Sequence, residues 1–298
     1  MKGQILLLII PIFFTLSVAG QKTDAISAIG LTVISQVNQG DSYITFPTDI
    51  GNLEPLMTEM NLIPNFYLRH NKSYKLLGVI TPQVIIRVFK ERSAPIRTPS
   101  YMPQFTFYYL FSENENNRKA SLFWRLAHHS NGQDGDPFLE NGEINLKNGD
   151  FSTNFFELGI IKTRFINRYD AYQFFKSSIE VHPVKWSAYE LKGTYSTVRW
   201  HNVLSIFKLP SKDFQNREKK TSISLKGEAT WMFGELNNWN WASLKRLNLG
   251  LTFYYHPNFL EDIGLFMQMY HGLDYYNIYF NHKLDVVRFG IMTEKLRF

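Results

Sequence analysis

Apolar and polar residues alternate in several long stretches of this chain after residue 40. Between residues 222 and 231, every second position carries Ile, Leu, Gly, Ala or Trp, and the positions between them carry Ser, Lys, Glu or Thr. The stretch 247–255 repeats the pattern, with Leu, Phe and Tyr on one set of positions. Side chains of a β-strand point alternately to its two faces, so this period predicts strands with one apolar face. Helical periodicity is not convincing anywhere after residue 20, and we predict no helix there.

Twelve strands are predicted in this way, separated by polar, turn-rich segments such as 112–119 and 211–220. An even number of strands is typical of single-chain bacterial membrane barrels. The approximate ranges of the predicted strands are 43–54, 61–70, 74–90, 101–112, 119–130, 152–166, 171–183, 194–208, 221–233, 246–256, 262–272 and 285–298.

The alternation alone does not tell whether the apolar face points inward, as in a soluble sandwich, or outward, as in a membrane barrel. Three features favour the barrel. The predicted strands are about ten residues or longer, as a tilted crossing of a bilayer requires. Aromatic residues gather at strand ends, as at 105–109 and 275–280, and the chain ends on Phe298, as the last strands of outer-membrane barrels commonly do. We therefore predict an all-β fold, a transmembrane antiparallel β-barrel of about 12 strands.

The first 20 residues have the pattern of a secretory signal peptide. Lys2 is their only charge, the run 5–16 is apolar, and small residues precede Gln21. A membrane anchor is the alternative, but it needs about 20 predominantly apolar residues, and this run is shorter. We therefore predict a signal peptide at 1–20 and a single exported barrel domain at 21–298.

Composition narrows the possible functions. The chain has no cysteine, which excludes a disulfide framework, a thiolate metal site and a cysteine nucleophile. Its 32 Lys and Arg residues against 26 Asp and Glu residues give a formal net charge of +6. This charge is too small and too dispersed to indicate nucleic acid as a partner.

Candidate chemistry lies at the end of the strand predicted at 119–130. His128 and Ser130 are two residues apart, so they share a strand face whose earlier positions, Leu122, Trp124 and Leu126, are all apolar. A serine beside an imidazole is the minimal activated nucleophile, because the imidazole takes the hydroxyl proton during attack. A short His-x-Ser pair followed by Asn-Gly is also ordinary turn sequence, so a catalytic interpretation requires a third residue.

The next predicted strand offers that residue. Asn154 begins a set of positions that continues with Phe156, Leu158 and Ile160, whereas Glu157 lies on the opposite face. We therefore expect Asn154 on the lipid side near the same rim. Its amide oxygen could accept the Nδ1–H of His128 and leave Nε2 free toward Ser130. Catalytic groups that face lipid imply a lipid substrate.

Several segments resemble one family of known proteins. The segment 128–132, His-His-Ser-Asn-Gly, is similar to the His-Asp-Ser-Asn-Gly signature of the bacterial outer membrane phospholipase A family. The stretches 93–97 and 101–104 resemble the loop and strand that precede the family's active site. The stretch 43–47 resembles its first strand, and 274–298 its last hairpin. The resemblance implies a 12-stranded barrel enzyme with a Ser-His-Asn triad on its outer surface.

By this resemblance Ser130 is the nucleophile, His128 the base and Asn154 the orienting residue. The turn at Gly132 is where the family forms its oxyanion hole, assisted by calcium that is bound across a homodimer interface. The resemblance implies a calcium site in which Ser93 of the partner subunit supplies a carbonyl oxygen. The other implied ligands are the carbonyl of Gln133 and the carboxylates of Asp150 and Glu190.

The chain departs from the family pattern at several positions. His129 replaces the acid of the signature, and Gln133 replaces an arginine. The stretch from Asp134 to Asp150 is longer than expected for the family and rich in Asp, Asn and Gly. It leaves alternatives to Asn154 as the partner of His128, namely Asn141, Asn145 and Asn148.

The sequence therefore predicts a calcium-dependent outer membrane phospholipase, active as a homodimer on acyl esters of glycerophospholipids. The alternatives are a non-catalytic barrel such as a small pore or adhesin, and a secreted soluble β-protein. Two charged pairs, Arg125 with Glu157 and Lys226 with Glu228, are predicted to face the lumen. His271 has no partner that the sequence reveals, and we assign it no role.

Overall fold

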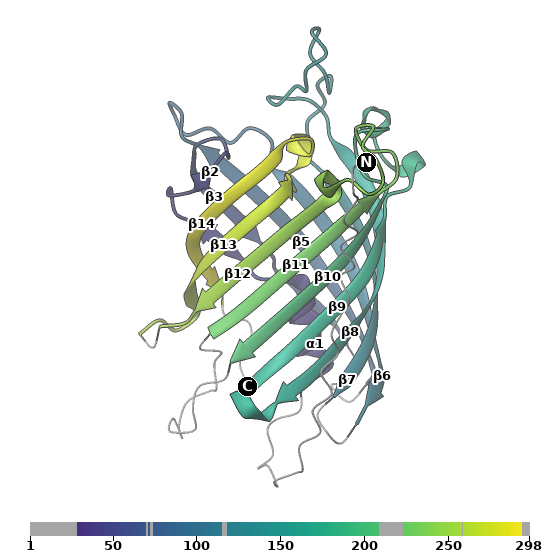
Figure 1. Cartoon of the computed structure of the whole chain (residues 1–298), viewed down its shortest axis with the longest axis vertical. Helices are drawn as coiled ribbons and strands as arrows, with labels where there is room; N and C mark the ends of the chain where they lie inside the picture. The colour runs from purple at the N-terminus through teal and green to yellow at the C-terminus, as the bar shows by residue number, and fades with distance from the viewer. Residues whose placement is uncertain are drawn as a thin grey trace, which may run out of the picture.

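The computed structural model describes residues 29–69, 71, 74–114, 118–208, 223–257 and 259–293. The predicted signal peptide at 1–20 and the terminal Phe298 lie outside these residues and stay predictions. The described chain forms one antiparallel sheet that closes on itself, with tilted strands around a lumen (Figure 1). The elements are α1 (Leu31–Gln39), β1 (Tyr43–Thr45), β2 (Ile50–Gly51), β3 (Leu56–Leu62), β4 (Phe66–Leu68), β5 (Leu76–Phe89), β6 (Ser100–Glu113), β7 (Lys119–Ser130), β8 (Ser152–Ile166), β9 (Ala171–Val181), β10 (Val198–Lys208), β11 (Ile223–Phe233), β12 (Leu247–Tyr255), β13 (Ile263–Leu273) and β14 (Lys283–Thr293), with five short 3-10 turns between strands.

The ring has twelve strands, as predicted. Consecutive strands pair around the ring, and β1 pairs with β14 to close it. Two ring positions are each made of two short segments: β1 and β2 both pair with β14, and β3 and β4 both pair with β5. The ranges 119–130 and 152–166 were predicted as observed. The first hairpin differs from the prediction in two ways: its second strand begins at Leu56 and not at residue 61, and both strands are interrupted, at Pro47 and Pro64. Proline lacks the N–H that a ladder bond needs, so the chain leaves the sheet at both positions.

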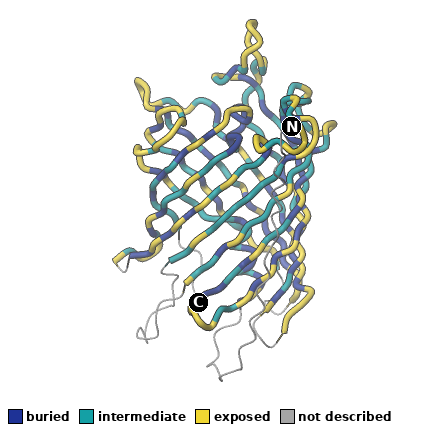
Figure 2. The backbone as a smooth tube through the Cα atoms, viewed as in Figure 1, coloured by how far each residue is buried: buried dark blue, intermediate teal, exposed yellow. Residues whose placement is uncertain are grey.

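The apolar side of each strand points outward, which contradicts the soluble sandwich. On β7, Leu122, Trp124 and Leu126 are about 40% exposed, at 38%, 40% and 42%, while Phe123 and Ala127 are buried. The same alternation of buried and exposed residues runs along most strands in Figure 2. Many of the inward positions are polar or charged, which is the reverse of a soluble protein and typical of barrels that face lipid.

Charged pairs fill the lumen, as predicted for two of them. Arg125 Nη1 donates to Glu157 Oε2 over 2.8 Å, and Lys226 Nζ lies 2.9 Å from Glu228 Oε1. Inward-facing charges that pair with each other avoid the cost of unpaired charge in a protein interior.

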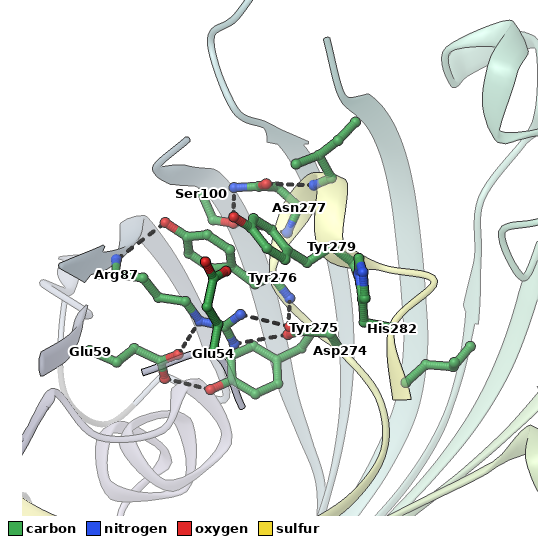
Figure 3. Close-up of polar contacts among 12 residues, drawn as sticks. Glu54, Glu59, Arg87, Ser100, Asp274, Tyr275, Tyr276, Asn277, Tyr279 and His282 are labelled. Atoms are coloured by element: carbon green, nitrogen blue, oxygen red, sulfur yellow. Dashed lines mark hydrogen bonds and ion pairs between the residues drawn. The ribbon is translucent and has the colours of Figure 1, made fainter. Parts of the chain in front are cut away.

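The largest lumenal network centres on Glu59, which is fully buried (Figure 3). Its carboxylate accepts hydrogen bonds from Arg87 Nε over 2.7 Å and from Arg288 Nη1 over 2.6 Å. The guanidinium of Arg87 also binds Asp274 through both terminal nitrogens, at 2.6 and 2.9 Å, and lies 4.3 Å from the centre of the Tyr276 ring. The network joins strands from the two ends of the chain, so it ties the closure of the barrel together.

One short helix contradicts the prediction that no helix follows residue 20. Helix α1 lies inside the lumen, near the rim where β5 and β7 begin (Figure 1). Its buried Leu31 and Ile34 pack against inward-facing residues of β5, β6 and β7. Asn38 Nδ2 donates to the Tyr108 hydroxyl over 2.8 Å and so holds the last turn. With nine residues and several β-branched side chains, α1 has little intrinsic helix preference, so its packing in the lumen decides its structure. No helix in the described part of the chain is long and apolar enough to cross a bilayer.

Truncation of Ile34 tests the packing of α1. Ile34 is fully buried, so Ile34→Ala is expected to lower the free energy of unfolding by about 2–4 kcal/mol. Urea titration of the barrel in lipid vesicles, followed by tryptophan fluorescence, measures this change. Leu244→Ala is the control, because Leu244 is 73% exposed and its truncation should change the free energy of unfolding by less than about 0.5 kcal/mol. Equal stability of the two variants would contradict the docking of α1.

Candidate active site

The three predicted catalytic residues lie at one rim of the barrel, where β7 ends and β8 begins; we call it the upper rim. Antiparallel pairing sets His128 directly opposite Asn154, and Ser130 opposite Ser152. Asn154 Oδ1 lies 3.0 Å from His128 Nδ1. Because the amide oxygen can only accept, Nδ1 carries the proton and Nε2 is the ring nitrogen left as a base.

Ser130 occupies the next outward position of β7 after His128, about 7 Å farther along the strand. Both side chains are half-buried. Below them the same outward face carries Leu126 on β7 and Leu158 on β8, which are 42% and 56% exposed. A hydroxyl and an imidazole therefore border an apolar surface at the rim, where an amphiphile could present a polar bond.

The orientation of the Asn154 amide is set by a neighbouring segment. Its Nδ2 donates to the backbone carbonyl of Trp186 over 2.6 Å. With the amide nitrogen held in this way, Oδ1 faces His128. Trp186 lies in the short turn Val184–Trp186 that follows β9. Sequence reasoning did not find this contact, because any residue can supply a backbone carbonyl.

A group of hydroxyls and one imidazole fastens that segment to β8. Thr153 Oγ1 lies 2.9 Å from His182 Nδ1 and 2.7 Å from Ser187 Oγ. The backbone N–H of Ala188 donates to the carbonyl of Ser152 over 2.8 Å. Thr153 points into the barrel while its neighbour Asn154 points outward, so the two faces of β8 hold the same segment.

Asn131 was not predicted as a site residue, but it organises the turn after Ser130. Its buried side chain donates to the carbonyl of Gly149 over 2.8 Å and accepts from the backbone N–H groups of Gln133 and Phe151. These bonds join the two ends of the 131–151 segment. Gly132 follows with φ +66°, a left-handed conformation that glycine adopts without strain. The Ser-Asn-Gly turn signal in the sequence was the available clue.

The carboxylates predicted to bind calcium gather beside this turn. The backbone N–H of Asp150 donates to the carbonyl of Gly135, and Glu190 lies in the short turn Tyr189–Leu191. Burial raises the pKa of the Asp150 carboxyl, and the negative charges of Glu190 and Asp134 raise it further. The charges of Glu190 and Asp134 therefore act on the Asp150 carboxyl, and a cation beside Asp150 would offset them.

These donors fit a hard cation only in part. Carboxylate and carbonyl oxygens are the ligands that Ca²⁺ prefers. Among the described residues, no three His, Asp or Glu side chains are arranged to hold a metal ion. Calcium at this turn would need backbone oxygens, such as the carbonyl of Gln133, and water to complete its shell. Ser93 lies in the turn between β5 and β6 at the same rim, with φ +71°.

The alternative partners for His128 serve the loop in which they lie. Asn145 is buried and donates to the carbonyl of Asp136, and Asn141 donates to Glu143. The carbonyl of Asn148 accepts from Gly135. His129 is buried on the lumenal side of β7, where its Nε2 lies 3.1 Å from Ser100 Oγ.

Similar folds are found among solved structures of outer membrane phospholipase A. The enzyme of Escherichia coli superposes with a TM-score of 0.58 at 13% identity, covering 90% of this chain and 99% of that chain. A calcium-bound dimer of the enzyme from Salmonella typhi gives 0.58 at 14% identity, covering 91% and 99%. An active-site mutant of the Escherichia coli enzyme gives 0.57 at 12% identity, covering 92% and 95%. At such low identity the similarity establishes a shared fold.

Comparison by sequence alone finds no counterpart: neither a protein-family model nor a curated protein matches this chain.

Proposed function

We propose that this chain is an outer membrane phospholipase A that hydrolyses acyl esters of glycerophospholipids. The observation that carries the proposal is the outward-facing pair of His128 and Asn154, 3.0 Å apart, with Ser130 at the next outward position above an apolar surface. The Asn154 amide also holds the Trp186 carbonyl, whereas the described contacts give the His128 side chain no hydrogen bond other than that to Asn154. The barrel fold shared with phospholipases supports the same activity.

In the proposed mechanism, a phospholipid approaches the rim from the bilayer with its ester at Ser130. His128 Nε2 takes the hydroxyl proton as Ser130 Oγ attacks the ester carbonyl, and the resulting oxyanion meets backbone N–H groups of the Gly132 turn. His128 returns the proton to the departing alcohol of the lysophospholipid. Water then hydrolyses the acyl-enzyme with His128 again as base. Asn154 keeps the ring oriented throughout, although a neutral amide stabilises the imidazolium less than a carboxylate would.

Calcium is part of the proposal. Asp150 and Glu190 would hold the ion with the carbonyl of Gln133, and when bound it would supply positive charge near the developing oxyanion. The calcium-bound dimer of the Salmonella typhi neighbour supports a homodimer in which Ser93 of the partner subunit adds a carbonyl oxygen. The monomer would then lack a complete calcium site and would stay inactive in an intact membrane until it dimerises.

The outer membrane is the proposed location, reached through the signal peptide predicted at 1–20. The band of exposed apolar side chains around the barrel supports a bilayer environment.

The test is release of fatty acid from phospholipid–detergent micelles by the refolded barrel, with calcium and with a chelator. Release that requires calcium supports the proposal. A folded barrel that releases no fatty acid in excess calcium contradicts it and favours the non-catalytic pore or adhesin.

Removal of one proposed ligand tests the calcium site. Asp150→Asn is expected to raise the calcium concentration for half-maximal activity by at least about tenfold, because calcium affinity follows the charge of its ligands. The maximal rate at saturating calcium should change far less. Glu143→Gln, in the same loop but bonded to Asn141, is the matched control and should leave the calcium dependence unchanged. The same half-maximal concentration in all three proteins would place calcium elsewhere.

Truncation of Asn154 tests the orientation of the base. Asn154→Ala is expected to lower kcat by about 10²-fold, since a misplaced ring loses the alignment that attack requires. KM should stay within about threefold, because Asn154 is proposed to contact the base and not the substrate. Asn145→Ala is the comparison, since Asn145 was an alternative partner. A larger loss of kcat in Asn145→Ala with the barrel folded would reverse the assignment.

A further inference from the structure

A second histidine with a hydrogen-bonded partner lies on the outer surface, far around the ring from β7 and β8. His271 on β13 stands directly opposite Asp285 on β14, and its Nδ1 is hydrogen-bonded to Asp285 Oδ1. Both side chains are about half-exposed, at 42% and 57%. Toward the upper rim β13 continues with Gly272 and the buried Leu273, so no outward hydroxyl follows this histidine as Ser130 follows His128. The pair is therefore suited to binding rather than to nucleophilic attack.

The pair ends a partly polar row that crosses five strands. Successive antiparallel partners on the outward face are Asn202 on β10, Ala229 on β11, Leu249 on β12, His271 and Asp285. Because β10 runs downward from the upper rim, this row lies one outward position nearer that rim than the row containing Leu204. A bilayer leaflet places its polar groups on the same side.

The row below is apolar and has a gap. It runs from Leu204 through Gly227 and Leu251 to Met269, again as direct cross-strand partners. A Cβ added to Gly227 would meet no atom within 4 Å, so the glycine opens onto empty space. The two rows line a hollow of about 850 Å³ on the outer surface. The hollow is apolar below, and its upper row carries Asn202 at one end and the His271–Asp285 pair at the other.

We propose that this hollow binds one zwitterionic phospholipid of the bilayer, with an ethanolamine headgroup. An acyl chain would lie over Gly227 between Leu204 and Leu251. The headgroup would reach the His271–Asp285 pair, where an imidazolium ring, with a proton on each nitrogen, would donate from Nε2 to the phosphate and the carboxylate would bind the ammonium. Asp285 accepts the Nδ1–H, so Nε2 is the ring nitrogen that faces the headgroup. The proposal uses the membrane location of the proposed function but not its catalytic activity.

The same features argue against a second copy of the chain as the occupant. A neighbouring barrel presents a convex surface, whereas the site is hollowed at Gly227. The separation of polar and apolar rows also matches one amphiphile oriented along the membrane normal.

The experiment is native mass spectrometry of the barrel in detergent micelles, titrated with palmitoyl-oleoyl phosphatidylethanolamine or with the matching phosphatidylglycerol. All proteins carry Ser130→Ala, so that bound lipid is not hydrolysed and the result does not depend on the phospholipase proposal. We expect one retained phosphatidylethanolamine per barrel. Gly227→Leu should weaken its binding at least about tenfold by filling the hollow, and His271→Leu should remove the preference for ethanolamine over glycerol.

Leu122→Phe is the control, since it adds bulk on the outward face of β7 and should bind as the parent does. Heat-modified migration on gels confirms folding, and Gly227→Ala serves in the event that Gly227→Leu does not fold. Equal retention of both lipids by the parent, or binding unchanged in Gly227→Leu and His271→Leu, overturns the proposal. If the parent protein is detected as a dimer and Gly227→Leu abolishes that dimer, the lipid proposal is wrong and the hollow binds a second copy of the chain. Loss of activity in the phospholipase assay leaves this result unaffected.

Discussion

Replacement of the proposed nucleophile, Ser130→Ala, is expected to reduce fatty-acid release by at least about 10³-fold. The hydroxyl is the only group in the proposed site that forms a bond to the acyl group, so no neighbour can substitute for it. Release should be measured from phosphatidylethanolamine–detergent micelles at saturating calcium, where binding of the metal does not limit the rate.

The matched control is Ser152→Ala, which removes a hydroxyl from the residue paired directly with Ser130 on β8. This variant should keep activity within about threefold, because its side chain has no proposed role in the reaction. Activity that survives in Ser130→Ala but is lost in Ser152→Ala would identify Ser152, and not Ser130, as the nucleophile. If both variants keep their activity, neither serine is the nucleophile and the proposed serine mechanism is wrong.

The largest effect on stability is expected at Glu59, far from the proposed site. Glu59→Ala leaves Arg87 and Arg288 without the carboxylate they share, although Arg87 keeps Asp274. An uncompensated buried charge costs about 3–5 kcal/mol of unfolding free energy. This loss of stability arises from the guanidinium left unpaired, so it does not measure the net contribution of the intact ion pair to folding.

Glu54→Ala provides the comparison for Glu59→Ala, because Glu54 also binds an arginine, Arg97, but is 40% exposed. Solvent screening limits this exposed pair to about 0–1 kcal/mol. Urea unfolding of both variants in lipid vesicles gives the two values. A similar decrease in unfolding free energy in Glu54→Ala and Glu59→Ala would show that burial does not determine how much these ion pairs contribute to stability.

The strands were predictable because their signal is local. A residue in a strand points to the face opposite that of its neighbour, so Leu122, Trp124 and Leu126 reveal their common face without any knowledge of the fold. The same rule placed His128, Ser130 and Asn154 on the outward face, and the register of β7 with β8 then set His128 against Asn154. Proline interrupted the first hairpin for an equally local reason, although the prediction gave it too little weight.

Contacts between segments distant in sequence were not predictable. The Trp186 carbonyl that holds Asn154 and the Arg288 that binds Glu59 have no sequence pattern that joins them to their partners. Helix α1 belongs with them, because its nine residues become helical where the lumen provides an apolar surface and hydrogen-bond partners.

The sequence by itself therefore determined the strands, their two faces and the candidate catalytic residues, since each follows from the alternation of side chains along one strand. The tertiary structure alone decided which side chains meet across the lumen, at the upper rim and on the far outer surface. The physical reason is closure of the barrel: only when β1 pairs with β14 are residues more than two hundred positions apart brought within hydrogen-bond distance.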